Sequence, residues 1–175
     1  MPQTGLVIVV PEAEMRFGAM RRRFDPQADL GVPAHITVLF PFMPPELIDT
    51  NVCQRLRRLF GQLSPVQFQL ERVGRFPLTT YLAPEPTDSL VELTNAVVED
   101  FPEYPPYGGA YASVIPHLTI ADGQVEIANL AEIELRNSLN LHGPVRAHCN
   151  FVSLLENSAG RWRVMHEFAL GKQEG

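Results

Sequence analysis

Cysteine is scarce in this chain, with two residues in 175, Cys53 and Cys149. Two cysteines cannot build a disulfide framework, and they cannot supply a four-ligand zinc site. We therefore expect reduced thiols and a cytoplasmic protein. Long apolar runs are missing as well, because the run Leu6–Val10 is far shorter than the roughly 20 residues that span a bilayer.

Positive charge is also in short supply, since the net charge is −6. A protein that wraps long nucleic acid normally carries a basic surface that neutralises phosphates. Two local basic groups exist, Arg21–Arg23 and Arg55 with Arg57 and Arg58. We interpret both as solvated helix faces, with a phosphate-facing rim as the alternative. The charge favours a small phosphorylated substrate over a long polymer.

Several catalytic motifs are absent. No GxGxxG occurs, and Gly108-Gly109 is not followed by the Lys-Ser/Thr of a phosphate-binding loop, so we interpret it as a turn. The sequence holds no carboxylate cluster with metal-ligand spacing and no setting for a nucleophilic serine. We therefore expect neither a cofactor, nor a metal, nor covalent catalysis.

What is present is an ordinary globular composition, with 45% hydrophobic and 19% charged residues. Strand patterns and helix patterns mix without a regular βαβ period, which predicts an α+β fold with antiparallel sheets and helices on one face. The predicted strands are 5–10, 35–42, 66–76, 79–84, 117–121 and a final hairpin within 145–170 that turns at Asn157–Gly160. The predicted helices are 12–24, one from Pro45 to Gly61, Ser89–Phe101 with Ser89 and Glu92 at capping-box spacing, and a short one around Leu130–Leu139.

One pattern is written twice. "PAHITVLF" contains His35 and Thr37, and "IPHLTIAD" contains His117 and Thr119. In a strand, residues two apart share a face, so each strand offers a His/Thr pair on one side and apolar residues on the other. With five histidines in 175 residues, chance gives only about 0.2 His-x-Thr sequences. The matched pair therefore indicates function.

Two imidazoles suit acid–base chemistry at neutral pH. One accepts a proton from an attacking hydroxyl or water, and the other donates a proton to the oxygen that leaves. Threonine hydroxyls can bind the non-bridging oxygens of a phosphate. Because attack and departure at phosphorus are roughly in line, the base and the acid should flank the phosphate from opposite sides.

"HITV" and "HLTI" resemble the paired signatures of the 2H phosphoesterase superfamily, and the order of elements is most similar to the bacterial 2′-5′ RNA ligase-like branch. "GRFP", "YLAP" and "YPPYGGAY" are similar to segments of bacterial members. The resemblance covers nearly the whole chain. It implies one bilobal domain over 1–175, with two antiparallel sheets flanked by helices around a central cleft of pseudo-twofold symmetry. It also implies metal-independent and ATP-independent chemistry on 2′,3′-cyclic or related phosphodiesters.

Carried over residue by residue, the resemblance makes His35 and His117 the acid–base pair and makes Thr37 and Thr119 the phosphate contacts. It does not fix which histidine is the base. Three further residues are candidates for substrate binding: Tyr107 and Tyr111 in the loop before the second motif, and Arg75 near a strand connection. For the tyrosines, packing at a cleft edge is the alternative to stacking on a nucleobase.

The leading hypothesis is an enzyme that opens a 2′,3′-cyclic phosphate on a nucleotide or an RNA 3′ end. If a 5′-hydroxyl replaces water, the same geometry gives a reversible 2′-5′ RNA ligase. The alternative is a nucleotide- or RNA-binding module of the same fold without physiological turnover. A third hypothesis, a metal hydrolase with histidine ligands, predicts loss of activity in chelator. No membrane association and no obligate protein partner is expected.

Overall fold

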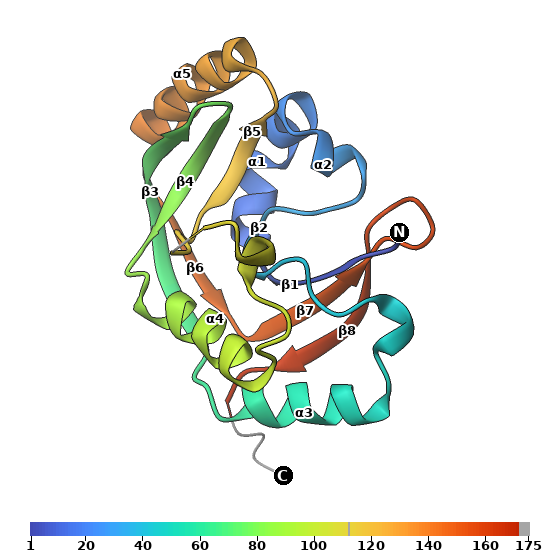
Figure 1. Ribbon diagram of the computed structural model, residues 1–175. Coiled ribbons are helices and arrows are strands. Elements are labelled where there is room, and N and C mark those ends of the chain that lie inside the picture. The colour runs from blue at the N-terminus through green and yellow to red at the C-terminus, as the bar shows by residue number, and fades with distance from the viewer. Residues whose placement is uncertain (112, 172–175) are drawn as a thin grey trace.

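The computed structural model describes residues 1–111 and 113–171, which build two four-stranded antiparallel sheets (Figure 1). The first sheet has the order β2-β1-β7-β8, and the second has the order β5-β4-β3-β6. The strands of the first sheet are β1 Thr4–Val9, β2 His35–Leu39, β7 Phe151–Glu156 and β8 Arg163–Ala169. Those of the second are β3 Val66–Phe76, β4 Thr79–Glu85, β5 Leu118–Asp122 and β6 Val145–Cys149. The predicted α+β class is confirmed.

Helices cover both sheets. They are α1 Pro11–Phe24, α2 Pro26–Asp29, α3 Thr50–Gly61, α4 Asp88–Asp100 and α5 Val125–His142, with 3-10 turns η1 Pro45–Leu47 and η2 Pro106–Gly109. Helices α1 and α5 contact the second sheet, whereas α3 contacts β8 and α4 contacts β2 (Figure 1). No helix in the described part of the chain is long and apolar enough to cross a membrane.

The two motif strands lie at corresponding places in the two sheets. Strand β2 is the edge of the first sheet and β5 is the edge of the second, and the two strands contact each other. Ile36 and Val38 of β2 are buried in the core, while His35 and Thr37 on the other face are half-buried. The predicted alternation is therefore confirmed. Both sheets repeat one arrangement, as the expected pseudo-twofold symmetry requires.

The helix predicted from Pro45 to Gly61 is wrong at its start. Pro45 opens only the short turn η1, and α3 begins after Asp49, whose Oδ1 accepts the Val52 N–H at 2.9 Å. This side chain satisfies a free donor of the first helical turn and so fixes the start of α3 there. Leu47 is consequently 52% exposed and is no part of the core. The predicted end at Gly61 is confirmed.

Two other helix predictions need correction. Helix α4 begins at Asp88 and its N-cap is Thr87, without a side-chain hydrogen bond, so the capping box of Ser89 and Glu92 does not form. Helix α5 runs over Val125–His142 and is much longer than the predicted Leu130–Leu139. Its buried face includes Ala128 and Ala131, whose small side chains gave little hydrophobic signal.

Candidate active site

Two adjoining cavities form a cleft beside the two motif strands. The smaller has a volume of about 480 Å³ and is lined by His35, Thr37 and His117 among others. The larger has a volume of about 640 Å³ and is lined by His117 and Thr119. His117, Tyr107 and Asp122 line both, so the cavities are continuous at the second motif. The structure thus brings together all four motif residues.

The two histidines are held in the same way. His35 Nδ1 lies 2.8 Å from the Pro33 carbonyl, and His117 Nδ1 lies 2.7 Å from the Ile115 carbonyl. A carbonyl only accepts hydrogen bonds, so Nδ1 is the donor in both rings. Each Nε2 is therefore the nitrogen left to take or give a proton in the cleft. The same bond, from the ring to the backbone carbonyl two residues earlier, thus orients both imidazoles.

The environment of His35 favours its neutral form. Desolvation in the cleft lowers the pKa of His35 to about 4, although its hydrogen bond to the Pro33 carbonyl raises it. The positive charges of Arg21 and His117 lower the His35 pKa further. At neutral pH, His35 is therefore an unprotonated imidazole that can accept a proton.

His117 lies among different neighbours. Burial lowers the pKa of His117 below its usual value, and the hydrogen bond to the Ile115 carbonyl and the carboxylate of Asp122 offset this lowering only in part. Two aromatic rings enclose the imidazole, with Phe76 at 5.3 Å and Tyr81 at 5.5 Å between ring centroids. Asp122 is exposed and is oriented by the Thr79 hydroxyl, which donates to its Oδ1 at 2.6 Å. A carboxylate beside His117 and a cation behind His35 give the two imidazoles opposite electrostatic settings.

The loop that carries Tyr107 and Tyr111 lies where the two cavities meet. Tyr107 has a φ of 52° and its N–H donates to the Phe40 carbonyl at 2.6 Å, at the end of the first motif strand. Its ring contacts that of Tyr111 edge to face, with 5.6 Å between centroids. Tyr107 lines both cavities and Tyr111 lines the larger. Both predicted tyrosines are thus placed at the cleft.

Arg75 lies elsewhere. Its Nη1 donates to Asn129 Oδ1 at 2.9 Å and to Glu132 Oε1 at 3.1 Å, both on α5, and it lines neither cavity. The second basic group is also remote: Arg57 and Arg58 line a separate hollow beside β7 and β8. The solvated-face interpretation of the first group is right for Arg22 and Arg23 and wrong for Arg21, which is 1% exposed. The reason is that Arg21 lies on the face of α1 that packs against β5.

Sequence reasoning missed several residues of the cleft. Trp162, Phe40 and Leu30 line the smaller cavity, and Phe76 lines the larger. The Trp162 ring packs edge to face on Phe40 at 5.9 Å, which makes an apolar wall facing the motif residues. Trp162 is far from both motifs in the chain, so no local pattern indicates that it lines the cleft, whereas Phe40 lies only three residues after Thr37. Among the described residues, no three His, Cys, Asp or Glu side chains gather as metal ligands.

A sequence model described as the 2′-5′ RNA ligase superfamily matches residues 9–161. The chain belongs to this superfamily. A protein from Bacillus licheniformis, whose name proposes a phosphoesterase, is 28% identical over 94% of this chain and 97% of its own length. A protein from Bacillus cytotoxicus with the same kind of name is 30% identical over 87% of each chain. The family suggested by the two motifs is therefore confirmed.

Solved structures share the same fold. E. coli LigT in complex with 3′-AMP aligns with a TM-score of 0.61 at 17% identity, over 97% of this chain and 99% of LigT. A Thermus thermophilus protein aligns with a TM-score of 0.59 at 18% identity, over 98% of this chain and 100% of its own. At such identities the likeness establishes the two-sheet fold, and the chemistry has to be argued from this chain's own cleft.

Proposed function

We propose that the chain is a phosphoesterase that opens 2′,3′-cyclic phosphates by two-histidine acid–base catalysis, without metal or ATP. The observation that carries the proposal is the matched pair of imidazoles. Each is tied through Nδ1 to the carbonyl two residues earlier, and each leaves Nε2 to one shared cleft. A binding module has no need for two such titrating groups.

His35 is the base and His117 is the acid in this proposal. His35 Nε2 takes a proton from water as the water oxygen bonds to phosphorus. The bond from phosphorus to O2′ or O3′ breaks, and His117 Nε2–H gives its proton to the departing oxygen. This assignment rests on the pKa of His35, which is lowered to about 4, and on Asp122, which partly offsets the lowering of the His117 pKa and leaves His117 the more basic imidazole. His35 then loses its proton to solvent and His117 takes one up, which restores the starting state of both rings.

The threonines bind the phosphate in this mechanism. Thr37 and Thr119 share the His faces of their strands and line the cleft, one in each cavity. Their hydroxyls donate to the two non-bridging oxygens, on which negative charge develops in the transition state. If the 5′-hydroxyl of a second nucleotide replaces water, the same proton transfers produce a 2′-5′ linkage.

The lining of the cleft favours a small substrate with a single phosphodiester charge. None of the described residues that line either cavity is lysine or arginine, and Asp122 lines both. Every further phosphate would enter without a cation to neutralise it, which RNA-binding surfaces normally supply. The aromatic walls offer stacking to one nucleobase instead. LigT has been crystallised with the mononucleotide 3′-AMP, which is in keeping with a substrate of this size.

The test is incubation of the purified protein with each 2′,3′-cyclic mononucleotide, in chelator and without ATP, while 2′- and 3′-monophosphates are resolved. We expect one regioisomer as product, and we expect a 5′-phosphate on the same nucleotide to lower kcat/KM. A kcat/KM raised by the 5′-phosphate would contradict the substrate class. Nucleotide binding without turnover of any cyclic or linear phosphodiester would instead favour the binding module.

A further inference from the structure

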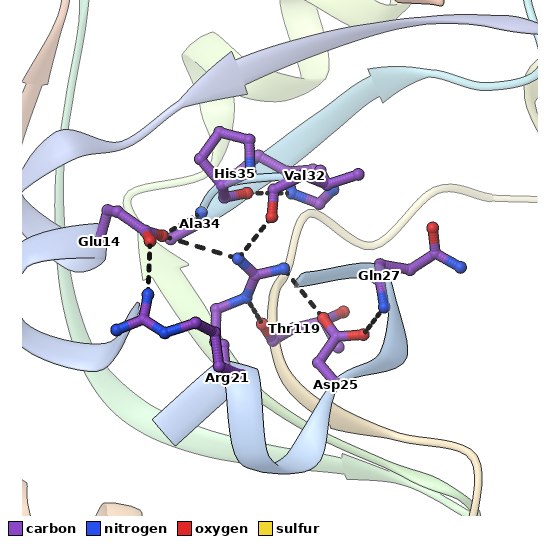
Figure 2. A network of polar contacts seen from close by, with 10 residues as sticks. Glu14, Arg21, Asp25, Gln27, Val32, Ala34, His35 and Thr119 are labelled. Carbon is purple, nitrogen blue, oxygen red and sulfur yellow. Dashed lines mark hydrogen bonds and ion pairs between the residues drawn. The ribbon is translucent and has the colours of Figure 1, made fainter. Parts of the chain in front are cut away.

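Arg21 is a buried cation directly behind the two motif strands. Its side chain is 1% exposed, and its guanidinium has a partner on every side. Nε donates to the Thr119 carbonyl at 3.1 Å, Nη1 to the Val32 carbonyl at 2.9 Å and Nη2 to Asp25 Oδ2 at 3.0 Å (Figure 2). Glu14 Oε2 lies 3.6 Å from Nη1. A planar guanidinium with this many partners is fixed in position and in orientation.

Two of these acceptors belong to the motif segments themselves. Thr119 is the threonine of the second motif, and Val32 immediately precedes Pro33, whose carbonyl holds the His35 ring. Glu14 adds a third tie, because its Oε2 accepts the Ala34 N–H at 2.7 Å (Figure 2). One ion pair on α1 thus holds the backbone on both sides of Pro33 and, on the other motif, the backbone of Thr119.

We propose that Arg21 is a positioning residue, which fixes the His35 segment against the second motif strand so that both imidazoles reach one phosphate. This inference rests on the function proposed above. The two motif strands are the edges of different sheets, and β2 and β5 are hydrogen-bonded to β1 and β4 rather than to each other. The separation between the histidines is therefore set by side chains, and Arg21 bonds to both segments at once.

The charge of Arg21 has a second consequence at the same place. Two cations act on His35: Arg21 from α1 and His117 from the opposite motif, and both lower the His35 pKa. Asp25 and Glu14 are bonded to Arg21, and Asp122 acts on His117. Arg21 thus favours the neutral form of His35, which is the form that the proposed base needs.

The experiment compares Arg21→Lys, Arg21→Met and the control Arg23→Met, which removes an exposed arginine two residues further along the same helix. Lysine keeps the charge but cannot reach the Thr119 and Val32 carbonyls together. We therefore expect kcat for a 2′,3′-cyclic nucleotide to fall about 10-fold to 100-fold in Arg21→Lys, because a misplacement near 1 Å has such effects. KM should change little, and the acid limb of the pH profile of kcat should not shift. Methionine also removes the charge, so the acid limb should move to higher pH. Arg23→Met should match the wild type.

Because Arg21→Met leaves Asp25 buried without a cation, Glu14→Ala provides a second variant. The Glu14 side chain is 35% exposed, and its removal frees the Ala34 N–H while Arg21 keeps its other bonds. We expect kcat to fall severalfold. Histidine titration by NMR adds a readout independent of turnover: the pKa of His35 should stay in Arg21→Lys and rise in Arg21→Met.

A kcat equal to that of the wild type in folded Arg21→Lys and Glu14→Ala would overturn the inference. A loss of kcat in Arg23→Met as large as that in Arg21→Lys would also overturn it. An unchanged His35 titration in folded Arg21→Met would overturn the electrostatic part. Failure of the proposed function looks different, because His35→Gln and His117→Gln would then retain activity whatever Arg21 does.

Discussion

Replacement of Gly74 by alanine should damage catalysis through one displaced ring. Gly74 pairs with Tyr81 across β3 and β4, and a Cβ at position 74 would lie 2.3 Å from Cζ of the Tyr81 ring. The same ring packs on Phe76 at 4.5 Å and on His117 at 5.5 Å between centroids. Tyr81 is buried, so it has no solvent to move into. The ring has to shift toward the histidine or leave its place.

The size of the shift follows from van der Waals contact. Carbon atoms approach to about 3.5 Å, so the ring must move by more than about 1 Å. Overpacking of this kind costs about 1–3 kcal/mol of stability. A misplacement of about 1 Å at the reacting groups costs about 100-fold in rate. We therefore expect kcat of Gly74→Ala to fall by one to two orders of magnitude in a protein that still folds.

The assay is steady-state turnover of a 2′,3′-cyclic nucleotide, together with urea unfolding of the same samples. Gly61→Ala is the matched control, because a Cβ there meets nothing closer than the Gly171 carbonyl at 4.0 Å. Gly61→Ala should keep its activity. A folded Gly74→Ala protein with the kcat of the wild type would refute the idea that the Tyr81 ring holds His117 in its working position.

Four further predictions can be checked with the same protein. The unfolded state binds a proton at a free histidine near pH 6.5, whereas folded His35 does so only near pH 4. Stability should therefore fall by as much as about 3 kcal/mol as the pH drops through that window, and by less in His35→Gln, as measured by urea unfolding. Asp122→Asn removes a charge that raises the His117 pKa, so the basic limb of kcat should move to lower pH; an unmoved limb would count against His117 as the acid. If the nucleobase of the substrate lies in the smaller cavity, Trp162→Ala should raise KM about tenfold, and if it lies in the larger cavity, Tyr111→Ala should do so, because stacking is worth about 1–3 kcal/mol per nucleobase. An unchanged KM in both variants would exclude stacking. His117→Gln should lose far less activity on a p-nitrophenyl phosphodiester than on a cyclic nucleotide, since p-nitrophenolate leaves without an acid, whereas equal losses would contradict its role.

Local patterns were enough to predict most strands and the four motif residues. Alternation places Ile36 and Val38 in the core, and it leaves His35 and Thr37 on the other face. The second copy of the pattern then indicates that the pair acts together. Such inferences succeed because a strand's two faces are fixed by a period of two, whatever the rest of the fold does.

What the sequence could not reveal depends on packing between distant segments. The run of three arginines gives no sign that one member is buried, since charge alone looks the same at all three positions. A signal did exist: Arg21 follows Ala13 and Phe17 at intervals of four, so it shares their buried helix face. Trp162 had no comparable signal, because it reaches the cleft through a hairpin connection whose path is set by tertiary contacts.

The helix errors have a similar origin. Pro45 is a fair start for a helix by its own preferences, but the Asp49 side chain satisfies the first turn of α3, so the helix begins at Thr50, five residues further along. Side-chain caps compete over a few residues, and the apolar spacing of the segment does not record which one wins.

His35 and His117 are the general base and the general acid of one reaction in this account. The most direct measurement is kcat for a 2′,3′-cyclic mononucleotide in chelator, by the wild type, His35→Gln and His117→Gln, each first shown to be folded. We expect each variant to lose about 100-fold to 10,000-fold, the usual contribution of one acid or base. The pH profile of kcat for the wild type should have an acid limb, and we expect this limb to be absent in His35→Gln. Activity within a few-fold of the wild type in either variant would contradict the account.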